Sequence, residues 1–279
     1  MDANAAALLA PYQMAGKIAL ITGGTGGIGR ACVERLHAYG ATIAFTYIDG
    51  VESAMEAQSI YRGLERVSAH PVDLRDAASI KACIREVMTR YDQLDILVNN
   101  AAVGSATVER FSDDPGEQDR LMLAINADGT LKMCQSFLTE LKTLPASRRK
   151  IINISSVGGG INVFPGFRLS DGMSKAAVAF MTRQLAAEHA QSAFDIFALC
   201  PGATNTAMFQ HSTLDQLSAA DRSVFLDGLP KRRLIEPAEI AAIVHFLATD
   251  LSTPMHGAVI DASMGLGVRP GLMTESQSH

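Results

Sequence analysis

Eight residues near the start of the chain, TGGTGGIG at 22–29, have the composition of a phosphate-binding turn. They follow an apolar run typical of a strand and lead into a segment whose apolar residues recur at helical spacing. Such a strand–turn–helix unit gathers free backbone N–H groups and the positive end of a helix dipole, which together bind a pyrophosphate. Glycines permit the tight turn and the close approach of the phosphates. The residues predicted to line this site are Gly23, Thr25, Gly27, Ile28 and Gly29.

The elements that would position this turn follow from alternating short β-branched runs and longer segments of helical periodicity. Strands are predicted at 17–22, 42–47, 67–70, 95–98, 150–154, 194–199 and 258–261. Helices are predicted at 27–39, 51–64, 77–91, 117–144, 174–190 and 237–249. This alternation predicts an α/β protein with a doubly wound parallel sheet of about seven strands and helices on both faces. We expect a single domain over residues 1–279, with a partly helical lid at 203–229.

Composition excludes several classes of protein. The 279 residues are 48% apolar and 19% charged, which suits a globular chain with a sizeable core. No apolar run is long enough for a membrane span, and no secretory signal is recognised. The net charge is −5, and we interpret the basic clusters at 148–150 and 231–233 as solvated loops, so no nucleic-acid partner is expected. Isolated cysteines at 32, 83, 134 and 200 suggest small core residues in a reducing cytoplasm, with no metal site.

The order of motifs resembles the short-chain dehydrogenase/reductase family along nearly the whole chain. The family's TGxxxGxG turn stands at 22–29, its NNAG motif appears as NNAA at 99–102, and its Pro-Gly pair as 201–202. The catalytic serine matches Ser156 in NISSVG, and the catalytic lysine matches Lys175 in MSKAA. The resemblance implies a Rossmann-type fold, a nicotinamide cofactor, and hydride transfer between that cofactor and a carbonyl or alcohol.

The resemblance also assigns roles to individual residues. Asn126 would bend its helix and hold a water leading to Lys175, Ser156 would bind the substrate carbonyl, and Lys175 would bind the nicotinamide ribose. Each residue also has a purely structural interpretation. Asn126 could be a buried asparagine whose hydrogen bonds are satisfied by backbone, Ser156 a polar residue at a strand end, and Lys175 a surface lysine. Asp73 matches the residue that contacts adenine. Beyond the glycine turn, the implied cofactor contacts are Tyr47, Asp73, Leu74, Asn100, Ala101, Ala102, Lys175, Pro201, Gly202, Thr204 and Thr206.

The sequence departs from the family pattern at the general acid, a tyrosine four residues before the lysine. Asp171 stands there, no tyrosine follows Tyr91, and the segment between Ser156 and Asp171 is two residues longer than usual. An aspartate titrates near pH 3.9, and Lys175 would lower its pKa further unless desolvation prevails. We therefore expect a carboxylate that acts as a base and donates protons poorly. Alternatively, Asp171 caps a helix and pairs with Lys175 at i,i+4.

Cofactor preference and reaction class stay partly open at this stage. The last position of the second strand, where an acid would select NAD, holds Tyr47, which favours NADP slightly, with NAD possible. Three readings compete: an oxidoreductase with an unusual proton donor, a non-redox cyclase, isomerase or lyase, and a degenerate subunit that supports an active paralogue. A partly apolar small substrate is expected. The resemblance implies a homodimer or homotetramer formed through the helices at 117–144 and 174–190.

Overall fold

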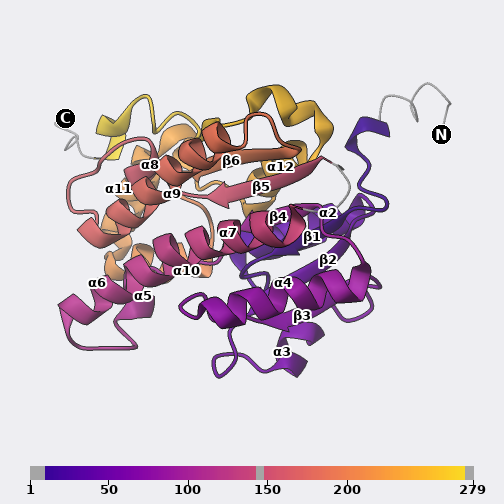
Figure 1. Cartoon of the computed structure of the whole chain (residues 1–279). Coiled ribbons are helices and arrows are strands. Elements are labelled where there is room, and N and C mark those ends of the chain that lie inside the picture. The colour runs from indigo at the N-terminus through magenta and orange to yellow at the C-terminus, as the bar shows by residue number, and fades with distance from the viewer. Residues whose placement is uncertain (1–9, 143–147, 274–279) are drawn as a thin grey trace.

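A computed structural model describes residues 10–142 and 148–273. Its seven parallel strands form one sheet in the order β3-β2-β1-β4-β5-β6-β7 (Figure 1). The strands are β1 (Ile18–Ile21), β2 (Thr42–Tyr47), β3 (Val67–Pro71), β4 (Ile96–Asn99), β5 (Arg149–Ile154), β6 (Phe194–Pro201) and β7 (Val259–Ala262). The predicted doubly wound sheet is confirmed.

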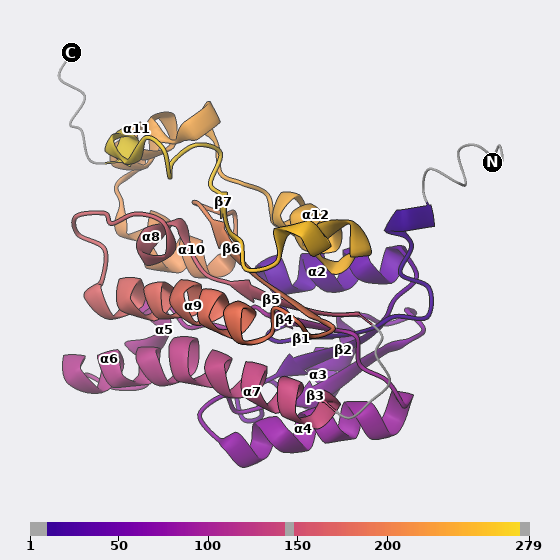
Figure 2. The same cartoon turned by 45° about the horizontal axis from the view of Figure 1, so that its top comes forward.

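Helices cover both faces of the sheet (Figure 2). On one side lie α2 (Gly27–Ala38) and α12 (Pro237–Ala248), and on the other lie α4 (Ala77–Tyr91), α7 (Thr130–Leu141) and α9 (Leu169–Glu188). The direction of winding reverses between β1 and β4, which pair with each other. In sheets of this type the ligand crevice lies at the carboxyl ends of the strands, beside this reversal. The glycine turn is therefore in the position of a ligand site.

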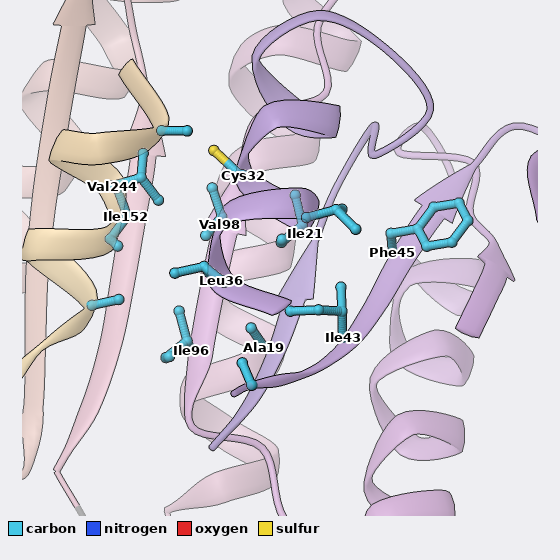
Figure 3. Packing of buried hydrophobic residues seen from close by; sticks show 14 of the residues in the cluster. Ala19, Ile21, Cys32, Leu36, Ile43, Phe45, Ile96, Val98, Ile152 and Val244 are labelled. Carbon is cyan, nitrogen blue, oxygen red and sulfur yellow. The ribbon is translucent and has the colours of Figure 1, made fainter. Parts of the chain in front are cut away.

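The core explains why the strands read as continuous apolar runs. All residues of β1 are buried, because helices pack on both of its faces. Figure 3 shows Ile21 and Val98 of adjacent strands beside Cys32 and Leu36 of α2. Full burial of one such aliphatic side chain stabilises the fold by about 1.5–3 kcal/mol. All four cysteines are buried, as predicted for small core residues.

The remaining helices are shorter and lie mainly around the carboxyl ends of the strands. They are α3 (Ala54–Ser59), α5 (Ser105–Val108), α6 (Pro115–Leu123), α8 (Val157–Gly160), α10 (Ala207–Ser212) and α11 (Ala219–Gly228). The helix predicted at 51–64 is too long: a Ser53 capping box starts α3, and left-handed backbone at Gly63 and Arg66 turns the chain into β3. Segment 203–229 contains α10 and α11, as expected of a partly helical segment, but its role as a lid stays a prediction.

The helix predicted at 117–144 is present but interrupted. It begins at Pro115, after the Asp114 cap, and a π-helical segment η2 (Ala124–Gly129) joins α6 to α7. The predicted end at residue 144 lies outside the described residues. In a π-helical segment the hydrogen bonds span five residues instead of four, so the turn is wider and its side chains point in different directions than in an α-helix. Asn126 lies inside this segment.

One basic cluster is not the solvated loop that the sequence suggested. Arg149 and Lys150 are buried in β5, and the Lys150 ammonium lies 2.6 Å from the carboxylate of Asp195 on β6. Thr253 Oγ1 accepts a further hydrogen bond from Lys150 at 3.1 Å. The interpretation was wrong because a buried lysine with satisfied partners looks the same in sequence as an exposed one. Among the helices of 10–142 and 148–273, none is both long and apolar enough to cross a membrane.

Candidate active site

The turn between β1 and α2 has the geometry of a diphosphate cradle. Gly23 and Gly27 have φ of +64° and +54°, in the left-handed region that favours glycine. A side chain at Gly29 would overlap the Gly23 carbonyl oxygen and lie 2.5 Å from Nδ2 of Asn100. Gly26 precedes α2 without a capping side chain, so the first N–H groups of the helix are left for a ligand. These features fit an anionic diphosphate at the helix N-terminus.

Three neighbours from distant parts of the chain support this turn. Thr22 Oγ1 accepts hydrogen bonds of 2.9 Å from the backbone N–H groups of Asn100 and Ala101, and Asn100 Nδ2 donates to the Gly23 carbonyl at 3.1 Å. A side chain on Gly27 would come within 3.2 Å of the Thr206 methyl group. The structure thus brings Asn100, Ala101 and Thr206 to the turn, and their contact with a cofactor stays a prediction.

Tyr61 is a contributor that sequence reasoning missed. Its hydroxyl donates to the Gly24 carbonyl, and its ring packs edge-to-face on Phe45 with 4.8 Å between centroids. Phe45 in turn fills the space that a side chain on Gly24 would need. Burial raises the pKa of Tyr61, which therefore stays neutral. No local motif marks Tyr61, because it follows a short helix and reaches the turn only through tertiary packing.

Other expected contacts have side chains that are already engaged within the protein. Asp73 forms a 2.6 Å ion pair with Arg75, whose hydrogen bonds lower the pKa of Asp73. Leu74 is a core residue packed against Gly129. Thr204 Oγ1 donates to the Gly202 carbonyl at 2.9 Å. Their contribution to cofactor binding stays a prediction.

The other expected cofactor contacts lie at the ends of strands or around the glycine turn. Tyr47 ends β2 and is buried, and its burial raises its pKa. Gly202 follows β6 and lies against Ser263, so a side chain on Gly202 would come within 3.0 Å of the Ser263 Cα. Thr25, Ile28 and Ala102 are half-buried around the turn and after β4. Pro201 is the last residue of β6.

Asn126 ties the π-segment to the loop that follows β4. Its Oδ1 accepts from the Val103 N–H at 2.8 Å, and its Nδ2 donates to the Val103 carbonyl at 3.0 Å. A longer contact of 3.4 Å reaches Ser174 Oγ on α9. The side chain is therefore satisfied by backbone, which is the alternative left open above. The π-segment supplies the expected irregularity of the helix, and the water-holding role stays a prediction.

Two adjacent serines at the end of β5 have different tasks. Ser156 caps α8 by accepting a 3.2 Å hydrogen bond from the Gly158 N–H, which leaves its own hydroxyl hydrogen for another acceptor. Ser155 donates to the Lys175 carbonyl at 2.8 Å and thereby fixes α9 against β5. Ser156 is half-buried, whereas Ser155 is fully buried. Of the two serines, only Ser156 keeps part of its surface exposed, and its contact with a substrate stays a prediction.

Asp171 and Lys175 lie one helical turn apart on α9, and both are half-buried. Burial lowers the pKa of Lys175, and the nearby Asp171 opposes this effect. Within the described part of the chain, the ammonium forms no hydrogen bond and no ion pair within 4.0 Å. A charged group held in this way is typical of a ligand site.

Two expectations for Asp171 were wrong. Its pKa is raised, because desolvation by burial exceeds the opposing charges of Lys175 and Arg168. It also caps no helix: α9 begins at Leu169, five residues earlier than predicted, and places Asp171 inside the first turn. Its carboxylate accepts no hydrogen bond from any residue of 10–142 or 148–273. The i,i+4 relation to Lys175 holds as a charge interaction rather than a contact pair.

The longer loop between Ser156 and Asp171 folds back onto α9. Gly159 has φ +88° and approaches the Gly172 carbonyl so closely that a side chain would overlap it. The Phe167 ring lies 3.2 Å from the position of a Cβ on Gly158 and 3.6 Å from one on Gly172. This ring therefore lies between the residues that follow Ser156 and Asp171.

The fold and this constellation define a class of dinucleotide-binding α/β enzymes, and comparisons with known proteins identify its family. Residues 23–267 match the family model described as enoyl-(acyl carrier protein) reductase. The chain is 31% identical to oxidoreductase UcpA of Escherichia coli over 259 residues, 91% of this chain and 96% of the relative. The chain therefore belongs to the short-chain dehydrogenase/reductase family, a family of oxidoreductases.

Solved structures agree with this assignment. The crystal structure of levodione reductase superposes with a TM-score of 0.80 at 27% identity, covering 91% of this chain and 98% of that one. An actinorhodin polyketide ketoreductase with NADPH superposes with a TM-score of 0.78 at 25% identity, covering 90% and 97%.

Proposed function

We propose that this protein is an NAD(P)H-dependent oxidoreductase that interconverts a carbonyl and an alcohol on a partly apolar small molecule, with Asp171 transferring the proton. The observation that carries the proposal is the turn between β1 and α2. There the absence of side chains at Gly23, Gly27 and Gly29 leaves room for a diphosphate. Lys175, whose ammonium has no partner among the described residues, supports a ribose hydroxyl as its ligand.

The cofactor would be held by groups already described. The first N–H groups of α2 would bind the diphosphate, and Lys175 would bind the nicotinamide ribose. We propose NADP rather than NAD, because β2 ends in a neutral, buried tyrosine where an acid would bind the adenosine 2′-hydroxyl. Of the reductases that superpose on this chain, one was solved with NADPH and another with NADH, so they support a nicotinamide cofactor of either kind.

The nicotinamide supplies or accepts the hydride when it is bound. Ser156 would donate its free hydroxyl hydrogen to the substrate oxygen and so stabilise the charge that develops there. Asp171 would give its proton to that oxygen during reduction and take it back during oxidation. Because burial raises its pKa, Asp171 is a better proton source near neutrality than an exposed aspartate. Lys175 would stabilise the carboxylate that remains.

Aromatic side chains beside Ser156 support an apolar substrate. Phe164 and Phe167 both border Gly158, and Phe167 is 42% exposed. On the opposite side, Met208 of α10 lies close to Gly104, where a side chain would come within 3.2 Å of the Met208 Cγ. We propose that residues 203–229 form a lid over this apolar region. Levodione reductase and the polyketide ketoreductase are named for carbonyl reduction, which supports the reaction type.

A second candidate is a subunit that has lost the chemistry and supports an active partner. The observation that favours it is the aspartate at the position of the family's tyrosine, together with an apolar stripe on α9. Leu169, Met173 and Phe180 are 77%, 51% and 65% exposed along this helix. Such a stripe supports assembly through α9, which a supporting subunit would need. For the chain as the active enzyme, we propose that the same stripe forms a homodimer or homotetramer.

Nucleotide binding by the purified chain tests the proposal. NADPH and NADH would be titrated calorimetrically, and NADPH oxidation would then be followed with cyclic, aromatic and aliphatic ketones. We expect NADPH to bind more tightly and to be consumed with an apolar ketone. Lys175→Met should weaken NADPH binding about tenfold or more, and Lys81→Met, on an exposed face of α4, should not. Absence of binding of both nucleotides would contradict the proposal, and binding without turnover would favour the second candidate.

A further inference from the structure

The first turn of α9 is held by another helix instead of by a capping side chain. Arg168 occupies the N-cap position and makes no capping hydrogen bond. Asp119 of α6 faces this turn, and one of its carboxylate oxygens, Oδ1, makes all three contacts with it. That oxygen lies 2.8 Å from Nε of Arg168, 2.7 Å from Nη2 of Arg168 and 2.6 Å from Oγ of Ser170. Ser170 is buried, whereas the Asp119 side chain is 49% exposed, so the contact lies at the edge of the packed region.

Asp171 follows these contacts immediately in the chain. Its own carboxylate accepts no hydrogen bond from the residues described, so the backbone of this turn sets where it lies. Arg168 is also one of the two cations that oppose the raised pKa of Asp171. Asp119 is ionised, since hydrogen bonds from Ser170 and Arg168 lower its pKa. The same carboxylate therefore anchors the turn and neutralises the guanidinium that Asp171 experiences.

We propose that Asp119 is a positioning residue for Asp171: through Arg168 and Ser170 it fixes the first turn of α9 and balances the charge facing the Asp171 carboxylate. This rests on the proposed function, in which Asp171 transfers the proton. Asp119 acts through other residues and touches no substrate.

The charges that face Asp171 can be counted element by element. Its own helix supplies Lys175, and the residue before that helix supplies Arg168. Helix α6 supplies Asp119, and β6 supplies Cys200, which interacts with Lys175. Residues 157–167, which pack on the same turn, include no titratable side chain. The Arg168–Asp119 pair is therefore the part of this charge distribution that substitutions can change. Removing the charge of Arg168 and removing the charge of Asp119 should shift the pKa of Asp171 in opposite directions.

This opposition gives a test that a purely structural role cannot imitate. The ¹³C carboxyl resonance of Asp171 would be titrated in the full-length protein and assigned with the Asp171→Asn variant. Asp119→Asn keeps an oxygen acceptor but leaves Arg168 uncompensated, so the Asp171 midpoint should fall by about half a pH unit. Arg168→Met removes the positive charge, so the midpoint should rise by about as much. Simple loosening of the turn would expose Asp171 and lower the midpoint in both variants.

Controls keep the inference separate from folding and from the proposed function. Glu117→Gln, also on α6, removes a carboxylate that pairs with Arg120 and should leave the Asp171 midpoint unchanged. Ser170→Ala removes one anchor without changing charge, so it should broaden the resonance or leave it in place but not shift it as Asp119→Asn does. Shifts of the same sign in both charge variants, or no shift in either, would overturn the proposal. The titration needs no cofactor, so failed nucleotide binding would count against the proposed function alone.

Discussion

Lys175 places a half-buried ammonium where the fold gives it no partner among the residues described, and this arrangement costs stability. Burial lowers its pKa, so the folded state binds a proton less tightly than the unfolded state. The protein should therefore become more stable as pH rises from the lowered pKa of Lys175 toward its unfolded value near 10.4. A site residue that is retained despite such a cost is typical of binding sites.

Lys175→Met should therefore raise Tm at neutral pH, by about 3 °C, while it weakens NADPH binding. The variant should also lose the alkaline gain in stability that the wild type shows. Thermal unfolding followed by circular dichroism between pH 7 and 10 measures both effects. A lower Tm for the variant would mean that the ammonium is paired in solution.

The raised pKa of Asp171 predicts that a proton-donating carboxyl group stays active to higher pH here than a surface carboxyl group would. Because burial raises its pKa, the protonated form persists to higher pH, and carbonyl reduction requires that form. The rate of reduction should be constant below the raised pKa and fall as pH increases through it, while alcohol oxidation should rise over the same window.

Asp171→Asn should lower kcat/KM for reduction by about 10²- to 10⁴-fold and flatten this profile. Steady-state rates across pH 4–9 with NADPH and a ketone substrate provide the measurement. Wild-type activity and an unchanged profile in Asp171→Asn would show that water or the substrate itself supplies the proton. NADPH affinity serves as the internal control, since Asp171 makes no contact with the glycine turn.

At the level of elements, the β1–α2 turn contains two glycines whose substitution by alanine should have different effects: Gly29→Ala should be harmful and Gly26→Ala should be tolerated. A methyl group on Gly29 would overlap the Gly23 carbonyl and crowd Asn100, so Gly29→Ala should push the turn open. We expect a loss of about 1–3 kcal/mol in unfolding free energy and no measurable NADPH binding. Gly26→Ala is the matched control: its φ is −155°, and no atom lies within 4 Å of a Cβ there. Equal damage by both substitutions would contradict the cradle.

The elements that sequence reasoning located best are those whose own pattern determines them. The bounds of β2 and α4 agree with the prediction because each combines clear periodicity with clear ends, such as the Asp76 cap of α4. The start of α9 was missed because tertiary contacts between Arg168 and Asp119 replace the local cap. The sign of the Asp171 pKa shift was missed for the same reason, since it depends on burial in the folded chain, which no local motif specifies.

At the scale of the whole molecule, topology explains why motifs separated by more than a hundred residues share one crevice. The glycine turn follows β1, Ser156 follows β5, and Thr206 follows β6. Parallel strands present all their carboxyl ends on the same edge, so each motif reaches that edge without a special connection. Motif order was therefore enough to predict that these motifs reach the same edge of the sheet, although it could not predict which side chains would be used internally, as those of Asp73 and Thr204 are.

The same scale decides how copies of the chain would associate. The exposed apolar stripe of Leu169, Met173 and Phe180 lies on one side of α9, and a helix face of this kind is self-complementary across a two-fold axis. Phe180→Arg should place two like charges opposite each other at such an interface, and it should convert the proposed dimer to monomers or the proposed tetramer to smaller assemblies.

Light scattering coupled to size-exclusion chromatography measures this change. Val224→Arg on α11 is the matched control, because Val224 is 61% exposed on a helix away from this stripe. It should leave the molar mass as it is in the wild type. Because Ser155 ties α9 to the end of β5, loss of the interface should also lower NADPH turnover more than NADPH binding. A wild type that is monomeric at micromolar concentration would remove the argument for assembly and leave the stripe as a surface for a different partner.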